Sequence, residues 1–137
     1  MEDFIRVGAA FNFLAGLFLL VYWFAYAIFL PYAKLSTTVS ILVRNRNWTW
    51  INTLGVIGAL LSLLGQGSIV LIQGDTSTWY VFSGYFLAVA GTSLLMGTMI
   101  WETVLWPILF RYDDSLLDFT GPLYSERTFI GFFVFSG

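Results

Sequence analysis

Three long stretches without a charged residue constrain this chain more than any other feature of its sequence. They run over residues 7–33, 47–74 and 76–101, and each holds at least 26 residues. A helix needs about 20 consecutive apolar residues to cross about 30 Å of hydrocarbon. The sequence therefore predicts three transmembrane helices, over about residues 5–31, 49–73 and 79–110.

The composition agrees with a chain whose surroundings are lipid. Of the 137 residues, 58% are hydrophobic and only 10% are charged, whereas about a quarter of the residues in a soluble domain are charged. The apolar runs are continuous rather than alternating, which excludes the strands of a membrane barrel. A membrane-spanning backbone must form all its hydrogen bonds within the protein, so the α-helix is the spanning structure that is left. The predicted class is all-α, an integral membrane helical bundle.

A fourth apolar segment begins near residue 127 and reaches Gly137. Ten helical residues rise about 15 Å, half of a bilayer. The segment is either a half-helix packed against its neighbours or the start of a fourth span in a chain truncated at its C-terminus, and we favour truncation. The expected organisation is a single domain, residues 1–137, with three complete transmembrane helices plus the start of a fourth.

The basic residues predict an orientation. Five of the six lie in two segments, loops 32–48 and 111–127. By the positive-inside rule these loops are cytoplasmic and the N-terminus is outside, and we expect the plasma (inner) membrane. Loop 32–48 is either a plain connector or a short interfacial helix carrying Leu35, Val39 and Leu42.

Aromatic residues gather near the predicted helix ends. Trp and Tyr favour the headgroup level because their rings are apolar and carry one polar group. Interfacial positions are therefore predicted for the Trp and Tyr residues at the ends of the three spans, among them Tyr22, Trp48, Trp79, Tyr80 and Trp106.

The residues that are missing exclude several kinds of site. The chain has no cysteine and no histidine, which removes disulfides, thiolate nucleophiles and the commonest general base and transition-metal ligand. It carries no phosphate-binding, dinucleotide-binding or metalloprotease motif. A net charge of −2 gives no basic surface for nucleic acid. We therefore expect no catalytic residue, no metal, no cofactor and no nucleic-acid partner.

Glu102 is the ionisable residue inside a long apolar run. A charged side chain at the bilayer centre costs about 3 kcal/mol on insertion scales, so such a residue is a candidate functional site. It is either an ion or proton site, or an interfacial acid paired with Arg44, Arg46 or Arg127. Pro107 favours the second interpretation, because a kink there would let residues 106–110 lie along the membrane surface.

Small residues form a stripe on each predicted helix. The stripes consist of Gly8, Asn12 and Gly16 on the first helix, Gly55, Gly58, Ser62, Gly65 and Gln66 on the second, and Gly84, Ala88, Gly91, Thr98 and Glu102 on the third. Small residues let helices approach closely, and polar ones bond across the contact. We expect the helices to pack through these stripes. In a second interpretation Asn12, Gln66, Thr98 and Glu102 line a polar passage.

Two functions compete on this basis. The first is a non-catalytic multi-pass membrane protein, an accessory subunit of a membrane complex that packs through its small-residue faces. Its expected partners are the lipid bilayer and either other membrane subunits or further copies of itself. The alternative is a small transporter or channel that uses Glu102 as an intramembrane ion or proton site.

Overall fold

The computed structural model describes residues 2–30, 39–72, 79–117 and 126, and every regular element in that part of the chain is helical. The elements are α1 (Glu2–Phe29), α2 (Val39–Arg44), α3 (Trp48–Ile72), α4 (Trp79–Ile100), the π-helical turn η1 (Trp101–Leu105), α5 (Trp106–Tyr112) and the 3₁₀ turn η2 (Asp114–Leu117). The predicted fourth segment, 127–137, lies outside the described residues, as does Leu35.

Three helical stretches are long and apolar enough to cross a membrane, which confirms the prediction at that level. They are α1, α3 and the stretch Trp79–Tyr112, in which α4, η1 and α5 follow one another. The first begins three residues earlier than the predicted residue 5 and the last ends two residues later than the predicted residue 110. The helical backbone thus continues through Pro107.

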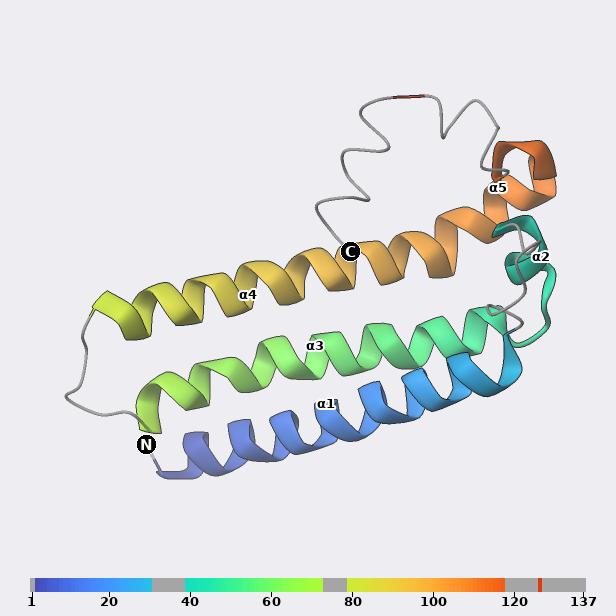
Figure 1. The fold of residues 1–137 in the computed structure, drawn as a ribbon. Coiled ribbons are helices and arrows are strands. Elements are labelled where there is room, and N and C mark those ends of the chain that lie inside the picture. Colours follow the sequence, from blue (N-terminus) through green and yellow to red (C-terminus); the bar gives the residue numbers. More distant parts are fainter. Residues whose placement is uncertain (1, 31–38, 73–78, 118–125, 127–137) are drawn as a thin grey trace.

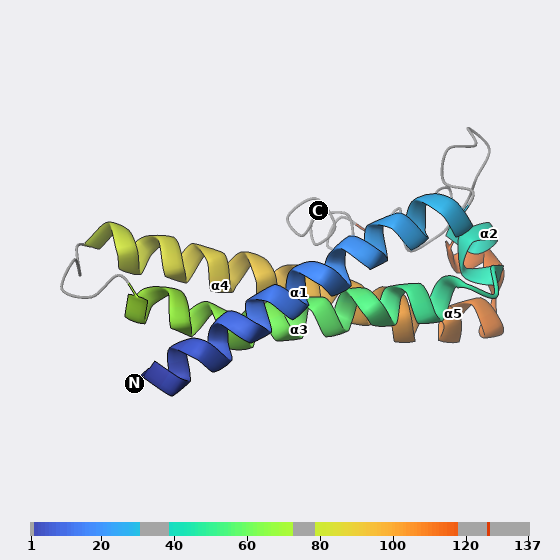
Figure 2. The same ribbon diagram turned by 90° about the horizontal axis from the view of Figure 1, so that it is seen from below.

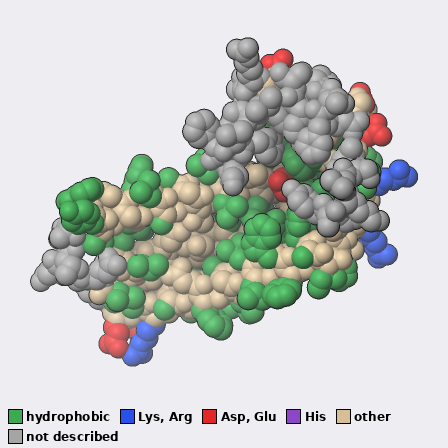
Figure 3. Space-filling model, in the orientation of Figure 1, with side chains coloured by type: hydrophobic (Ala, Val, Ile, Leu, Met, Phe, Trp, Pro, Cys, Tyr) green, Lys and Arg blue, Asp and Glu red, His purple; other side chains and the backbone are tan. Residues whose placement is uncertain are grey.

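The central helix of the structure is α3. In Figure 1, α1 lies along one side of α3 and α4 along the other, and Figure 2 shows α1 crossing α3 obliquely. In the most apolar window of α3, 33% of the residues are buried, against 11% in α1 and 11% in Trp79–Tyr112. Most of the outer surface of α1 and α4 is therefore apolar and uncovered. On the face shown in Figure 3, the basic side chains lie at the two ends of the helices.

The close contact between α1 and α3 depends on glycines. A Cβ at Gly65 would lie 2.9 Å from the backbone nitrogen of Asn12, and one at Gly58 would lie 2.8 Å from Cγ of Leu19. The two backbones are close enough for Asn12 Nδ2 to donate to the Gly65 carbonyl at 2.9 Å. Glycine permits this approach, and the side-chain amide bonds across it, as the stripes on these two helices predicted.

The contact between α3 and α4 follows a different set of residues. On α3 these are Trp48, Asn52, Gly55, Ala59, Ser62 and Gln66, and on the opposing stretch Thr92, Leu95, Met99, Glu102 and Trp106. Spacings of three and four place each set on one helix face. Two pairs fix the register. Trp48 stacks on Trp106 with ring centroids 5.7 Å apart, and a Cβ at Gly55 would lie 2.8 Å from Met99 Sδ. These eleven residues form the α3–α4 seam.

The seam corrects the prediction for the third helix. Gly84 and Gly91 are exposed, and a Cβ at either would have no neighbour within 4 Å; the same holds for Gly16 of α1. Spacings of four lead from Thr92 of the seam to Ala88 and Gly84, so these small residues lie on the same side of α4 as the seam. They are uncovered because α3 and α4 separate at this end, where Gly84 and Ala88 line a groove between the two helices.

The hydrophobic core lies at one end of the helices. Its buried members come from α1, α2, α3, α4, α5 and η2, and they include Tyr22, Leu42, Trp48, Trp106 and Leu117. Tyr22, Trp48 and Trp106 are thus covered by protein rather than turned to the surface, and their predicted place at the headgroup level stays a prediction. These rings pack on one another inside the protein, which removes more apolar area from the surroundings than an interfacial position would. Trp79 and Tyr80, at the opposite end, are exposed.

Gly65 gives a test of the α1–α3 contact. Replacing Gly65 by leucine should lower the free energy of unfolding by about 1–3 kcal/mol, because the new side chain meets the backbone of Asn12. The matched change Gly16→Leu, into open space on α1, should alter it by less than about 0.5 kcal/mol. Unfolding in mixed micelles, followed by circular dichroism, measures both. Equal losses for the two variants would contradict this packing.

Candidate functional site

Glu102 lies in the π-helical turn η1, directly before α5. The turn has a backbone cause. The amide of Trp106, which would bond the carbonyl of Glu102 in an α-helix, donates instead to the carbonyl of Trp101. The next residue, Pro107, has no N–H to offer. The Glu102 carbonyl is therefore left without either of the helical donors that follow it.

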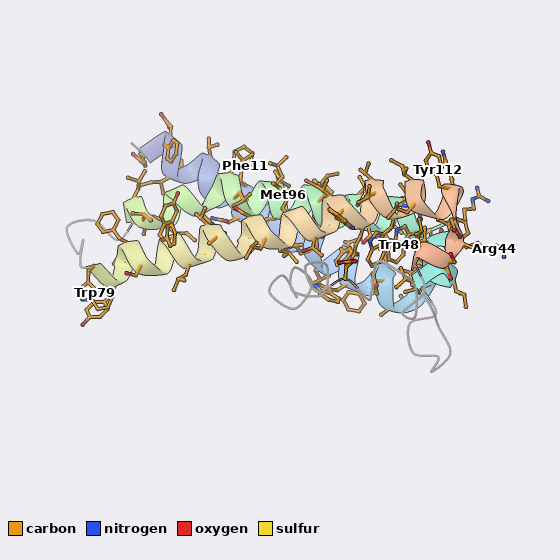
Figure 4. All side chains as sticks on the ribbon, turned by 90° about the horizontal axis from the view of Figure 1, so that it is seen from above. Phe11, Arg44, Trp48, Trp79, Met96 and Tyr112 are labelled. Atoms are coloured by element: carbon orange, nitrogen blue, oxygen red, sulfur yellow. The ribbon has the colours of Figure 1, made fainter. Side chains whose placement is uncertain are left out.

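The side chain of Trp48 supplies the missing donor. Its indole Nε1 donates to the Glu102 carbonyl oxygen at 2.9 Å. Trp48 is 1% exposed, and its ring lies between those of Tyr26, at a centroid distance of 6.3 Å, and Trp106. Figure 4 shows Trp48 at the end of the molecule that also holds Arg44 and Tyr112. One side chain from the start of α3 thus stabilises the irregular turn that carries Glu102.

The carboxyl group of Glu102 forms no ion pair with any described residue. Arg44 and Arg46, two of the predicted partners, are exposed, and the only ion pair within the described part of the chain joins Arg6 to Glu2. The third predicted partner, Arg127, lies outside the described residues. Glu102 interacts electrostatically with Tyr22 of α1, and Tyr22 is buried. The Glu102 carboxyl therefore lies near Tyr22.

Asn52 of α3 belongs to the same layer of the seam as Glu102. On α3, Asn52 lies between Trp48 and Gly55, four residues after the first and three before the second. On the facing stretch, Glu102 lies between Met99 and Trp106, three residues after the first and four before the second. Because Trp48 faces Trp106 and Gly55 faces Met99, Asn52 and Glu102 occupy the same level on facing helices. Asn52 is 0% exposed. Its Nδ2 donates to the Trp48 carbonyl at 3.0 Å, and its buried Oδ1 has no hydrogen-bond partner.

The other predicted polar residues lie elsewhere and do not meet at one place. Asn12 bonds across the α1–α3 contact. Gln66 lies in the α3–α4 contact, where its Nε2 donates to Thr92 Oγ1 at 2.7 Å. Thr98 donates to the carbonyl of Leu94 in its own helix. These side chains thus bond at separate contacts, and the polar passage stays a prediction.

A groove of about 320 Å³ opens between α3 and α4 at the end opposite the aromatic core. Its lining includes Gln66, Ile69, Val70, Tyr80, Gly84 and Ala88. Gln66 is largely buried, and its Oε1 has no hydrogen-bond partner in the described part of the chain. The two helices therefore pack less closely here than at the Trp48 end.

No family model matches the chain, and neither a curated protein nor a solved structure shows significant similarity to it. The chemistry of the site must therefore be argued from its own residues. Within the described ranges, no cluster of three or more histidine, cysteine, aspartate or glutamate side chains could hold a metal ion. The groups that the structure places at this level are the carboxyl of Glu102 and the amide of Asn52, with the phenol of Tyr22 near the carboxyl.

Sequence reasoning missed Asn52 and the donor role of Trp48. Both follow from a signal that was present, the spacing of four and three that runs through Trp48, Asn52, Gly55 and Ala59. The small residues of α3 were assigned to one stripe, although they belong to two helix faces. Gly58 contacts α1, whereas Gly55 contacts both Met99 and Tyr22. A search for two seams on the central helix would have placed Asn52 opposite Glu102.

Trp48→Phe tests the support of the turn. The phenyl ring cannot donate, so the Glu102 carbonyl loses its donor, and an unpaired acceptor costs about 1–3 kcal/mol. The smaller ring also leaves a cavity beside Trp106, which adds to the loss. Trp50→Phe is the matched control, because Trp50 is exposed and its Nε1 bonds only Asn47. The free energy of unfolding in mixed micelles should fall for the first variant and hold for the second. Indistinguishable values would refute the role of Trp48.

Proposed function

We propose that this chain is a non-catalytic, multi-pass membrane protein that works as an accessory subunit, with α1, α3 and the stretch Trp79–Tyr112 spanning the bilayer. The length and apolar character of these three stretches support the placement. In the proposed orientation the N-terminus is outside and loops 32–48 and 111–127 are cytoplasmic, in the plasma (inner) membrane.

The observation that carries the proposal is the uncovered small face of α4. Gly84, Ala88 and Gly91 share one side of the helix. All three are exposed, and no atom lies within 4 Å of a Cβ placed on either glycine. In lipid, where apolar burial does not drive helices together, such faces are the usual sites of close helix contact. The face therefore suits a transmembrane helix of another subunit or of a second copy.

The surroundings of this face favour the same function. Leu87 stands exposed on the flank of this face, and Phe82 and Phe86 stand exposed on the other side of the same helix. The groove that Gln66, Tyr80 and Gly84 line lies next to this face. A helix that packs along α4 would have both a flat contact strip and a hollow at its edge.

The alternative function, a small transporter or channel using Glu102, has weaker support. A passage would need its polar side chains along one line, whereas Asn12 and Gln66 bond on opposite sides of α3. The groove beside Gln66 lies at the end of the helices away from Glu102. Transport stays a prediction of the sequence.

Gly91→Leu tests the accessory function. A Cβ at Gly91 has no atom of the described residues within 4 Å, so the protein should fold as before, but a leucine would block a close helix contact on α4. Native electrophoresis of mildly solubilised membranes should show the wild-type protein in an assembly larger than the monomer and most of the variant as monomer. Gly16→Leu, on the open side of α1, is the control and should leave the assembly intact. A wild-type protein that migrates as a monomer would contradict the proposal.

A further inference from the structure

Asn52 and Glu102 share one layer of the seam, and no described donor bonds the Asn52 amide oxygen. The amide of Asn52 has a fixed orientation, because Nδ2 donates to the Trp48 carbonyl and Oδ1 therefore points away from it. Oδ1 is buried and unpartnered. An ionised carboxylate on Glu102 would also only accept. Left in that form, the layer would hold an unpaired charge on a half-buried side chain and an unpaired amide oxygen that is fully buried, which is costly on both counts.

No cation among the described residues neutralises a carboxylate at Glu102. The titratable group that faces Glu102 from α1 is Tyr22, and the seam residues of α3 around it, Trp48 and Asn52, do not titrate. The basic residues of α2 and α5, Arg44 and Arg111, are exposed and form no ion pair with it. A single proton neutralises it, since a protonated carboxyl both loses its charge and gains an O–H that can donate to an amide oxygen.

We propose that Glu102 and Asn52 form a proton-binding site, in which Glu102 carries the proton at neutral pH and donates its O–H to Asn52 Oδ1. The hydrogen bond joins η1 to α3 one layer away from the bond between Trp48 Nε1 and the Glu102 carbonyl. Both the side chain and the backbone of Glu102 are then held by α3. This site does not rest on the accessory function, and it requires no movement of protons across the membrane.

Infrared spectroscopy of the full chain in lipid nanodiscs tests the site. The C=O stretch of a protonated carboxylic acid lies apart from the amide and carboxylate bands, and the wild-type protein should show it at pH 7. Glu102→Gln should abolish the band and still fold, because the glutamine amide can donate to Asn52 Oδ1 in place of the acid. Asn52→Ala, which removes the acceptor without adding volume, should shift the band to higher frequency.

Asp113→Asn is the matched control. The hydrogen bonds that the Ser115 side chain and amide donate lower the pKa of the exposed Asp113 carboxyl, so it is ionised at pH 7 and should contribute no acid band. Absence of the acid band in the wild-type spectrum, which needs no variant to fold, would overturn the proposal. So would a band that Glu102→Gln leaves in place, or one whose frequency is the same with and without Asn52.

Discussion

The structure depends on how closely α1 and α4 can approach α3. If hydrocarbon surrounds the helices, covering one apolar surface with another gains little, and close contact and bonds between helices must supply the stability. Glycines of α3 make this contact on both sides, since Gly58 and Gly65 face α1 and Gly55 faces both Met99 and Tyr22. Two side-chain amides complete it, with Asn12 bonding to Gly65 and Gln66 to Thr92.

The irregular turn before Pro107 concentrates chemistry at one point. Proline removes a backbone donor, and the π-helical turn moves another by one residue. Trp48 donates to the carbonyl that both leave unbonded. π-helical turns occur frequently at functional sites. Here the turn places the acid of the long apolar run at the level of Asn52 and near Tyr22, at the end of the helices where the buried aromatic rings cluster. The same residues that stabilise this end of the protein therefore define its candidate site.

The sequence predicts the helices well because their length and lack of charge depend on the chain alone. It also predicts the packing of Gly8, Asn12 and Gly65, where small residues lie on both helices. It fails for Gly84 and Gly91 of α4, because small residues are covered only where two helices stay in contact, and α3 and α4 separate beside Gly84. Glu102 stands out in the sequence, whereas Asn52 does not, because an asparagine near a helix end is ordinary. Only the register of α3 against the facing helix, set by the contacts of Trp48 and Met99, shows that Asn52 lies opposite Glu102.

Placement of the helices in hydrocarbon is the central claim, and cysteine labelling tests it most directly. The chain has no cysteine, so single-cysteine variants report one position each. Phe13, Leu94 and Tyr112 are all exposed on the protein, so burial within the fold cannot protect any of them. In intact membranes a water-soluble maleimide should modify a cysteine at position 112 and spare those at 13 and 94 until the membrane is dissolved and the protein denatured. Equal labelling at all three positions in intact membranes would show that water, not lipid, surrounds these helices.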